Sequence, residues 1–336
     1  METHYIIYVR AAGDLALLTL KGPGPFKSDT IESMQILITG SSGLIGSSLI
    51  PYLAGQGHQV IRLIRSSPKP SEPEVRWDPA GGVIDPAGLE GAEAVIHLAG
   101  DPIAAGRWTP EKKARIRESR VNGTRLLCES LSRLSQPPKV IACASAIGYY
   151  GNRGDEILTE ESSPGTGFLA ETGVEWEKAA EPARRRGIRV VHLRFGIVLS
   201  PKGGALAMML PPFRMGLGGV LGNGRQIMSW VSLEDVLGAA VHALTHDSLS
   251  GPVNVTTPRP VTNREFTKAL GKVLRRPTIF PVPAFAVRAM FGELADEALL
   301  AGARVQPSRL LATGYRFRHP DIEAALQELL TSGDAP

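Results

Sequence analysis

The sequence is poor in cysteine and has no long apolar run. Cys128 and Cys143 are the two cysteines among 336 residues, which excludes a disulfide-rich secreted scaffold. Both lie in segments that look buried, so free thiols are expected, with a single disulfide between them as the alternative. No apolar run approaches the roughly 18 residues that a membrane-spanning helix requires. We therefore expect no association with a membrane.

Charge is scarce and evenly spread. Charged residues make up 21% of the chain and hydrophobic residues 43%, a balance that excludes wholesale disorder. The net charge is only +4, and no nucleic-acid partner or metal site is expected. The one dense basic group is interrupted by glutamates, as on a solvated helix face; it consists of Lys112, Lys113, Arg115, Arg117 and Arg120.

Residues 1–33 do not share the pattern of the rest. Their apolar stretch contains Arg10 and Asp14, so it lacks the uninterrupted core of a secretion signal. Met34 stands directly before the first strong strand. We interpret 1–33 as an N-terminal extension, either a start codon placed too far upstream or a small accessory hairpin. From the absence of export signals we expect a cytoplasmic protein.

From Gln35 onward, short apolar runs alternate with longer helical patterns. The runs are apolar on consecutive residues, as in strands buried on both faces. Such alternation predicts an α/β fold with a doubly wound parallel sheet and right-handed crossovers. The expected strands are Gln35–Thr39, Gln59–Ile64, Ala94–Leu98, Lys139–Ala144, Arg189–Arg194 and Val253–Val255, and the expected helices are Leu44–Ala54, Pro110–Leu134, Leu169–Arg186 and Leu233–Thr245.

After about residue 200 the pattern changes. A short apolar helix is expected to be interrupted by Pro211 and Pro212, and Asn223-Gly224 is a hairpin-turn signal before an IMSWV strand. Ser232 begins the next helix in the manner of a capping box. The last eighty residues are mostly helical and are interpreted as a lid or substrate lobe; their segments are TNREFTKAL, PAFAVRAMFG, ELADEALLAGARV and PDIEAALQELL.

The segment ILITGSSGLIGSSLI carries the strongest functional signal. A buried strand ends at Thr39, and Gly40, Gly43 and Gly46 follow at the start of a helix. Gly40 permits a sharp turn, Gly43 lets the backbone approach a pyrophosphate, and Gly46 lets the helix pack on the strand. The helix N-terminus then offers N–H donors to the phosphates. The pattern predicts a dinucleotide site.

The end of the second strand favours NADP over NAD. NAD-binding folds usually place an acidic residue there to bind the ribose 2′-hydroxyl. Here the strand runs through Ile64 to Arg65 and Ser66 with no carboxylate nearby. A guanidinium at this place can bind a 2′-phosphate and stack on adenine. The alternative is a solvated arginine at a strand end.

Together these motifs resemble the extended short-chain dehydrogenase/reductase superfamily from Gln35 to near the C-terminus. Further matches are HLAG, SRVNGT, SAIGYYG and LRFGIVL. More narrowly, RWDP, PPFRMGLGG, SWVSLEDV and RLLATGYRF resemble the "epimerase family" subgroup, which carries a C-terminal domain of unknown function. The resemblance implies a Rossmann-type domain at 34–200 to which 230–256 return, and a smaller, mostly helical substrate lobe at 201–229 and 257–332.

The resemblance also implies which residues contact NADP(H). The glycine loop, the end of the second strand, the HLAG segment and the LRFGIVL loop would surround the cofactor. Arg120 would reach a phosphate, with an exposed helix arginine as the equal alternative. The implied set is Gly40, Ser42, Gly43, Leu44, Ile45, Gly46, Ile64, Arg65, Ser66, Leu98, Ala99, Gly100, Arg120, Phe195, Gly196 and Val198.

The catalytic residues depart from the superfamily pattern of Ser, Tyr and Lys. Ser145 holds the serine place, but the helix expected to carry Y-x-x-x-K has Phe168 and Thr172 at those positions. Tyr149 and Tyr150 follow Ser145 closely, and either could exchange a proton with the substrate; packing beneath the substrate is the alternative. His97 is either a base or, more commonly at a buried strand end, a structural group.

The substrate site departs too. Nucleotide-sugar epimerases place an arginine before the segment that matches SWVSLED, and here Met228 stands there. Arg225 lies three residues away in an expected strand, so it should face the other side. Without that arginine a diphosphate has lost its main charge-assisted contact. An apolar pocket lined by Trp230, Met208, Met209, Phe213 and Phe291 is the hypothesis, with core packing as the commoner alternative.

Two functions remain open at this point. The first is an NADP-dependent oxidoreductase or epimerase that acts on an uncharged, partly apolar small carbonyl or hydroxyl compound. The second is a catalytically weak or inactive NADP(H)-binding protein that regulates or binds a partner. A homodimer through the helices at Pro110–Leu134 and Leu169–Arg186 is a further expectation taken from the superfamily.

Overall fold

The computed structural model describes residues 4–11, 14–21 and 33–331. The chain divides into two units, Met1–Ser33 and Met34–Pro336. In the first, β1 (His4–Ala11) pairs antiparallel with β2 (Asp14–Lys21). All further description concerns the second unit. No helix in the described ranges is long and apolar enough to cross a membrane.

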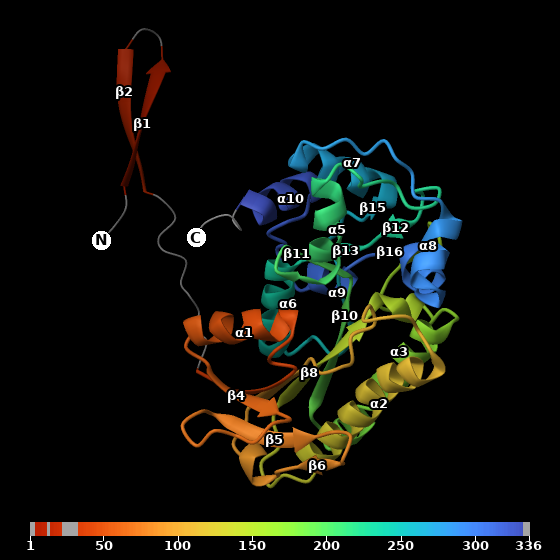
Figure 1. Cartoon of the computed structure of the whole chain (residues 1–336). Helices are drawn as coiled ribbons and strands as arrows, with labels where there is room; N and C mark the ends of the chain where they lie inside the picture. Colours follow the sequence, from red (N-terminus) through yellow and green to blue (C-terminus); the bar gives the residue numbers. More distant parts are fainter. Residues whose placement is uncertain (1–3, 12–13, 22–32, 332–336) are drawn as a thin grey trace. The chain divides into compact units, whose positions relative to one another are not determined.

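An eight-stranded sheet forms the centre of this second unit (Figure 1). Its strands are parallel except for the edge pair β5–β6. The predicted α/β class with a doubly wound sheet of Rossmann type is confirmed. In spatial order the strands are β14 (Gly251–Val255), β10 (Arg189–Phe195), β8 (Val140–Ala146), β7 (Ala94–His97), β3 (Gln35–Thr39), β4 (Gln59–Ile64), β5 (Glu74–Asp78) and β6 (Val83–Ile84).

Helices cover both faces of the sheet (Figure 1). On one face, α1 (Leu44–Gly55) and α6 (Leu233–Thr245) bury a core with Ile36 and Ile38 of β3. On the other face, α2 (Pro110–Ser132) and α4 (Glu181–Arg185) cover Leu37. Consecutive strand residues thus enter opposite cores, which is why the strands read as continuous apolar runs.

Most of the remaining C-terminal elements build a third core, whereas Leu310 packs in the core of α1 and α6. Trp230 and Phe213 are buried in it, whereas Met208 is exposed, so these side chains do not line one common pocket. The elements are α5 (Gly204–Arg214), β11 (Ile197–Ser200), β13 (Trp230–Ser232), β12 (Ile227–Met228), β15 (Val261–Thr262), α7 (Asn263–Leu274), α8 (Ala284–Phe291), α9 (Ser308–Ala312) and α10 (Ile322–Thr331). Short pieces complete the chain: 3₁₀ turns at η1 (Ala87–Leu89) and η2 (Ile147–Tyr150), a π-helical turn η3 (Ala295–Leu299), and the parallel pair β9 (Ile157–Leu158) and β16 (Arg304–Val305).

Several expectations for the C-terminal half are wrong in detail. Helix α5 continues through Pro211 and Pro212, because the missing N–H groups are tolerated near a helix end where Met215 and Leu217 still donate to the proline carbonyls. The IMSWV strand is split at Ser229 into β12 and β13. The Ser229 hydroxyl donates to the Ala303 carbonyl, 2.7 Å away.

Three further boundaries differ. Arg225 lies in an exposed loop and not in a strand, since the Asn223 side chain accepts its backbone N–H and closes a local turn. The segment ELADEALLAGARV contains the β16 strand as well as the π-helical turn. The helix expected at Leu169–Arg186 is two helices, α3 (Phe168–Lys178) and α4, because Pro182 supports a fresh helix start.

Candidate functional site

The glycine loop connects β3 to α1 at the carboxyl edge of the parallel strands. Gly40 has φ +69°, a left-handed conformation that side chains disfavour. A Cβ on Gly40 would lie 2.7 Å from the carbonyl carbon of Leu98, in the loop after the neighbouring strand β7. Gly40 is therefore required both for the turn and for the close approach of the two loops.

The other two glycines of the loop differ in their surroundings. A Cβ on Gly46 would lie 2.3 Å from the Gly40 carbonyl oxygen, so α1 can pack against the turn only because Gly46 has no side chain. A Cβ on Gly43 would meet only that oxygen, at 3.4 Å. Ser42 and Gly43 are exposed, while Leu44 and Ile45 are partly buried at the helix start. The loop thus presents exposed residues at the helix N-terminus, although the Gly43 N–H itself donates to the Gly40 carbonyl, at 3.0 Å.

The end of β4 carries an unneutralised positive charge. Arg65 and Ser66 follow Ile64 and are exposed, and no carboxylate among the described residues pairs with Arg65. By contrast, Arg62 in the same strand pairs with glutamates of the adjoining segment. Arg76 of β5 lies opposite Ile64 in the register, and its exposed side chain also has no ion-pair partner in the described ranges.

The loop after β7 is anchored to β3 by one threonine. The backbone N–H groups of Leu98 and Ala99 both donate to the Thr39 hydroxyl, at 3.1 and 3.2 Å. The guanidinium of Arg120 lies beside Gly100, whose Cβ would be 3.3 Å from it. Because of burial, the pKa of Arg120 falls to about 10.

Arg120 is not the exposed helix arginine that the sequence left as an alternative. Its Nη1 donates to the carbonyls of Asp101 and Ile116, and its guanidinium lies over the Trp176 ring. A largely buried guanidinium with carbonyl partners retains its full charge next to Gly100. Such a group is suited to an anion.

His97 at the end of β7 is a structural group. Its two ring nitrogens contact the hydroxyls of Thr39 and Thr124, at 2.7 and 2.9 Å. The ring is fully buried, and burial lowers its pKa to about 4. With both nitrogens occupied and no exposure, His97 holds β7 between β3 and α2 and does not reach a substrate.

A buried ion pair lies beside the serine of the expected catalytic set. Ser145 of β8 and Arg194 of β10 are opposite each other in the parallel register. The Ser145 hydroxyl donates to Glu177 Oε1, at 2.7 Å, and Arg194 donates to both oxygens of the same carboxylate, at 2.7 and 2.8 Å. The Ser145 proton is therefore committed to Glu177.

The charges of this pair stabilise each other. Burial acts to raise the pKa of Glu177, but the hydrogen bonds from Arg194 and the charges of His192 and Arg194 bring it below its ordinary value. Burial likewise acts to lower the pKa of Arg194, and Glu177 raises it overall. Both groups are ionised inside the protein at neutral pH.

The two tyrosines of the SAIGYYG segment have different environments. Tyr150 is fully buried, and its hydroxyl accepts from Arg194 and lies 2.8 Å from Asn254 Oδ1 and 2.9 Å from the Thr159 carbonyl. Its pKa is raised, chiefly by burial. The Tyr149 ring centroid lies 3.6 Å from Cζ of Arg194, and its hydroxyl has no hydrogen-bond partner in the described part of the chain. Tyr149 is thus the phenol that is free to act.

The third loop of the site follows β10. Phe195 is buried at the end of that strand, and Val198 lies in β11, partly buried against the core of α1 and α6. A Cβ on Gly196 would lie 2.5 Å from the Ser229 carbonyl oxygen. The N-terminus of α5 packs on the glycine loop, since Cβ atoms on Gly203 and Gly204 would lie 3.2 and 3.3 Å from the Leu44 side chain. Residues far apart in sequence therefore surround one edge of the sheet.

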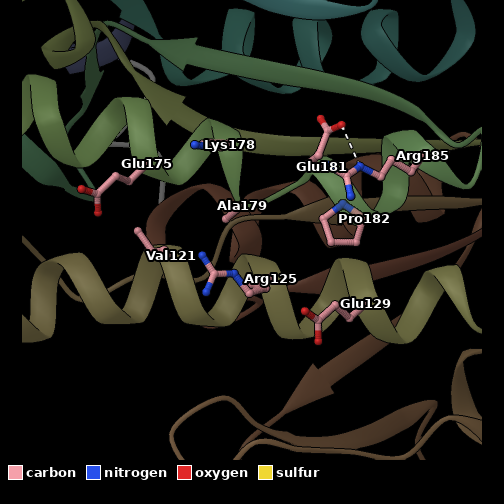
Figure 2. A pocket seen from close by; sticks show the side chains of 9 residues that line it. All are labelled: Val121, Arg125, Glu129, Glu175, Lys178, Ala179, Glu181, Pro182 and Arg185. Carbon is pink, nitrogen blue, oxygen red and sulfur yellow. Dashed lines mark hydrogen bonds and ion pairs between the residues drawn. The ribbon is translucent and has the colours of Figure 1, made fainter.

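The surface also has two hollows that are lined by residues outside the glycine loop. One of about 410 Å³ lies between α2, α3 and α4 and is lined mostly by charged side chains, including Arg125, Lys178 and Glu181 (Figure 2). The other, of about 740 Å³, lies near the N-termini of α2 and α3 and includes Trp108, Lys113 and Phe168. Phe168, at the superfamily's tyrosine position, packs edge-to-face on Trp108.

Comparison with known proteins identifies the family. Residues 36–256 match the model of the "NAD dependent epimerase/dehydratase family", and residues 282–329 match a "Domain of unknown function (DUF1731)". The chain belongs to the NAD dependent epimerase/dehydratase family. Relatives that match 87–88% of this chain are named epimerase family proteins, as the resemblance implied.

Three relatives illustrate the similarity. An epimerase family protein of Mycobacterium bovis is 48% identical over 291 residues, which cover 87% of this chain and 96% of that protein. The crystal structure of human epimerase family protein SDR39U1 with NADPH has a TM-score of 0.80 at 34% identity, covering 89% of this chain and 99% of that one. A structure titled nucleoside-diphosphate sugar epimerase, from Corynebacterium glutamicum, has a TM-score of 0.72 at 37% identity, covering 88% of this chain and 58% of that one.

Sequence reasoning did not find the Glu177–Arg194 pair in this family member. Arg194 lies in the LRFGIVL motif and Glu177 in the helix where the superfamily has its lysine, and neither residue was predicted to belong to the site. The sequence signal that could have found this pair is Arg194, a charged residue in the mostly apolar strand β10. Arg76 was missed in the same way, as part of the RWDP motif.

Proposed function

We propose that the chain binds NADP(H) across the glycine loop and the end of β4. The observation that carries this proposal is Arg65, an exposed cation without a carboxylate partner among the described residues, at the strand end where NAD-binding folds place an acid. Arg76, opposite Ile64 in the register, adds a second unpaired guanidinium. Two such groups suit the dianionic 2′-phosphate. The human relative that was solved with NADPH supports the same cofactor.

The remaining cofactor contacts follow from the site as described. The exposed backbone of Ser42 and Gly43 at the start of α1 would hold the pyrophosphate. Arg120, with its charge beside Gly100, would add a contact to a phosphate. Gly196 and Val198 would lie under the nicotinamide carboxamide, as the superfamily resemblance implies.

For the chemistry, we propose reduction of a small carbonyl compound or oxidation of the corresponding alcohol. The bound nucleotide supplies or takes up the hydride. In reduction, Tyr149 gives its hydroxyl proton to the carbonyl oxygen as the C–H bond forms, and solvent restores that proton. Ser145, whose proton is held by Glu177, accepts a hydrogen bond from the substrate hydroxyl. The Tyr150 hydroxyl accepts a hydrogen bond from Arg194 and so helps to hold the Arg194–Glu177 pair to which Ser145 donates.

The substrate is proposed to be uncharged and partly apolar. Met228 is buried in β12 at the place where a diphosphate-binding arginine would stand, and Arg225 points from an exposed loop. A diphosphate would find no charge-assisted contact at this position. A nucleotide sugar is therefore not the proposed substrate.

A second function is favoured by one observation. Thr172 is buried in α3 at the superfamily's lysine position, so the usual proton relay is absent and a regulatory NADP(H)-binding protein is the alternative.

Turnover of NADPH with a panel of aldehydes and ketones separates the two functions. The enzyme function predicts turnover that Tyr149→Phe reduces by about 100-fold or more. Retained cellular function in Ser145→Ala and Tyr149→Phe, together with no turnover, establishes the regulatory function.

The cofactor proposal is tested by calorimetry. Arg65→Ala is expected to weaken NADPH binding by about 10-fold or more, because a charge-assisted contact is lost, and to leave NADH binding nearly unchanged. Arg76→Ala should act in the same direction. Arg225→Ala, an exposed arginine elsewhere, serves as the control. Equal losses for NADPH and NADH would refute the role of Arg65.

The homodimer remains a proposal as well. The surface of α2, α3 and α4 around the hollow in Figure 2 presents both signs of charge, with Arg125 and Lys178 beside Glu129 and Glu181. A two-fold interface needs such a self-complementary patch. Sedimentation analysis of wild type and Arg125→Glu tests it: a wild-type dimer that the variant weakens supports this interface.

A further inference from the structure

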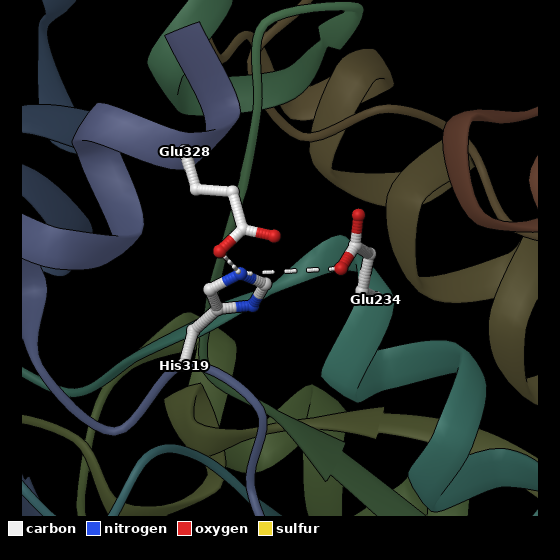
Figure 3. A group of neighbouring side chains, drawn as sticks. All are labelled: Glu234, His319 and Glu328. Carbon is white, nitrogen blue, oxygen red and sulfur yellow. Dashed lines mark ion pairs between the residues drawn. The ribbon is translucent and has the colours of Figure 1, made fainter. Parts of the chain in front are cut away.

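Three potential metal ligands converge where α6 meets the end of the chain. Glu234 is in the first turn of α6, His319 precedes α10, and Glu328 is on α10. One ligand atom from each lies within 4.8 Å of the others. Nε2 of His319 lies 3.2 Å from Glu328 Oε2 and 3.9 Å from Glu234 Oε2. Figure 3 shows the imidazole directed between the two carboxylates.

The Nε2 atom of His319 is buried and has no hydrogen-bond partner within residues 33–331 or the other described ranges. The side chain is only 3% exposed, so water does not compensate it. Both neighbouring glutamates are about half exposed, at 45% and 44%. The cluster is therefore open to solvent on its carboxylate side and closed on its histidine side. Ions can reach it.

The tautomer of His319 follows from its neighbours. The Ser232 hydroxyl donates to the Asp235 carboxylate across 2.8 Å. The backbone N–H of Asp235 donates to the same hydroxyl. Nδ1 of His319, 3.0 Å from Ser232 Oγ, must then be the donor in that contact. Nε2 is then the ring atom available to a metal, and it faces the carboxylates of Glu328 and Glu234.

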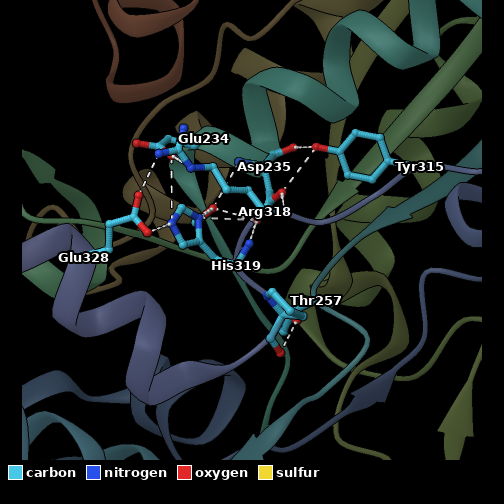
Figure 4. A network of polar contacts seen from close by, with 9 residues as sticks. Glu234, Asp235, Thr257, Tyr315, Arg318, His319 and Glu328 are labelled. Atoms are coloured by element: carbon cyan, nitrogen blue, oxygen red, sulfur yellow. Dashed lines mark hydrogen bonds and ion pairs between the residues drawn. The ribbon is translucent and has the colours of Figure 1, made fainter. Parts of the chain in front are cut away.

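The surrounding network holds the imidazole in this position (Figure 4). The backbone N–H groups of Arg318 and His319 donate to the two Asp235 oxygens, at 2.7 and 3.0 Å. The Tyr315 hydroxyl donates to the Asp235 carbonyl, at 2.9 Å. Metal-binding histidines characteristically have their second nitrogen fixed by such partners. The site thus has an ordered outer shell.

We propose that Glu234, His319 and Glu328 form a divalent transition-metal site that takes Zn²⁺, with solvent as the remaining ligand. Imidazole nitrogen and carboxylate oxygen are both zinc ligands, and tetrahedral ligands at their usual bond lengths are about 3.3 Å apart. Nε2 lies 3.2 Å from the Glu328 oxygen and 3.9 Å from the Glu234 oxygen, and small side-chain shifts bring both distances to this value. The lone pair of Nε2 and the two carboxylates then share one cation.

Arg318 is the competing cation. Its exposed guanidinium forms an ion pair with Glu234 Oε2, at 3.0 Å, and donates a hydrogen bond to Glu328 Oε1, at 2.7 Å. Zinc needs the Glu234 oxygen that Arg318 now contacts, so the ion must displace this side chain. Arg318 does not satisfy the buried Nε2, which has no hydrogen-bond partner among the described residues. Removing Arg318 should therefore strengthen the metal site, a result that a structural ion-pair network does not predict.

The experiment uses the full chain with any affinity tag removed and metal stripped by a chelator. Zinc affinity is measured by competition with a chromogenic chelator, and cobalt(II) absorption reports the ligand geometry. His319→Gln and Glu328→Gln should each weaken zinc binding by at least about 10-fold, a loss that outer-shell changes already produce. Arg318→Gln should tighten binding. The exposed Glu328 substitution keeps the test valid if the buried His319 variant does not fold.

Two controls separate this site from others. Glu323→Gln changes a second exposed glutamate of α10, which pairs with Lys272, and should leave zinc affinity unchanged. His246→Gln removes one member of the stacked pair with His242 on α6 and should also have no effect. A folded wild type that binds no zinc at millimolar concentration overturns the proposal. So does equal affinity in wild type and Glu328→Gln, which would show that Glu328 is not a ligand of the metal.

Discussion

At the scale of single residues, the buried polar groups of the sheet divide by whether they have a charged partner. His97 is satisfied by two threonine hydroxyls and stays neutral, whereas Arg194 is satisfied by the full carboxylate of Glu177. Burying a charge is costly unless a partner neutralises it. Acidification therefore destabilises the chain through His97, whereas removing Glu177 destabilises it by leaving Arg194 as an unpaired buried charge.

His97 predicts a pH dependence of stability. Its pKa is about 4 in the folded chain and about 6.5 when unfolded. Between these values the unfolded state binds a proton that the folded state does not, so stability falls as pH is lowered from about 6.5 to 4. One such histidine contributes a slope of about 1.4 kcal/mol per pH unit. Urea unfolding across this range should show a slope that is smaller by about this amount in His97→Gln.

His192 has the same pKa of about 4 for the same reason, so the wild-type slope exceeds that of one proton. The double variant His97→Gln, His192→Gln should be flatter again. An unchanged slope in His97→Gln would mean that burial does not keep this imidazole neutral.

Glu177 predicts a large loss of stability on neutralisation. In Glu177→Gln the buried Arg194 guanidinium keeps its charge but loses its counter-ion, which costs about 3–5 kcal/mol. Glu175→Gln, two residues earlier in α3, is the control, because its pair with Arg117 is at the surface and contributes about 1 kcal/mol or less. Urea unfolding at pH 7 measures both. Similar losses in the two variants would contradict a tightly coupled buried pair.

At the scale of elements, the turn from β3 to α1 separates the structural from the ligand-binding role of glycine. Gly46→Ala places a methyl 2.3 Å from the Gly40 carbonyl oxygen and should destabilise the chain by about 1–3 kcal/mol. Gly43 has φ −77°, which alanine accepts, and its Cβ has only one contact at 3.4 Å. Gly43→Ala should therefore fold normally and lose NADPH affinity by about 10-fold or more, since the methyl occupies the side where phosphate must approach. Thermal unfolding and calorimetry on the same samples separate the two effects; a destabilised Gly43→Ala would contradict the separation.

The elements that sequence predicted well are those whose signal is local. β3 and β4 were predicted with their observed bounds because both are uninterrupted apolar runs between turn signals. The start of α6 was predicted from Ser232, whose side chain accepts the Asp235 N–H as expected. The turn at Gly40 was likewise expected from the glycine spacing, and its positive φ agrees.

The elements that sequence did not predict depend on distant partners. β9 and β16 are two residues each and pair across about 150 positions, so neither has a local signal. The contact between Ser145 and Arg194 depends on which strands are neighbours and on their register. The loss of the superfamily's lysine was evident from Thr172, but the buried carboxylate that stands near Ser145 instead could be found only once α3 was placed over β8.

At the scale of the whole molecule, the three cores share strands. Ala142 and Ala144 of β8 enter the core of α1 and α6, while the alternate residues Ile141 and Cys143 enter the core of α2. In β13, Trp230 belongs to the C-terminal core and the next residue, Val231, to the sheet core. Separating one core from the next would therefore expose a strand that both require.

The C-terminal part is further joined to the sheet by specific polar contacts. Glu297 accepts the backbone N–H groups of Phe168 and Leu169 at the start of α3, and the Arg309 guanidinium donates to the carbonyls of Ser250 and Pro252 beside β14. A carboxylate at a helix N-terminus is stabilising both as a cap and against the helix dipole. The α3 helix thus begins correctly only when the C-terminal part is in place.

This sharing predicts that residues 34–331 unfold in one cooperative step. Trp77 lies in the α2 core and Trp230 in the C-terminal core, so each reports on a different part. In chains that keep one of these two tryptophans and carry phenylalanine at the others, the fluorescence midpoint in urea should match the far-ultraviolet circular dichroism midpoint of the same chain. Comparing probes within each chain removes the effect of any destabilisation by the substitutions. If the Trp230 signal were lost at lower urea than the helical signal, the C-terminal part would be an independent lobe, and substrate binding there could not restrain the sheet edge where Tyr149 and Ser145 lie.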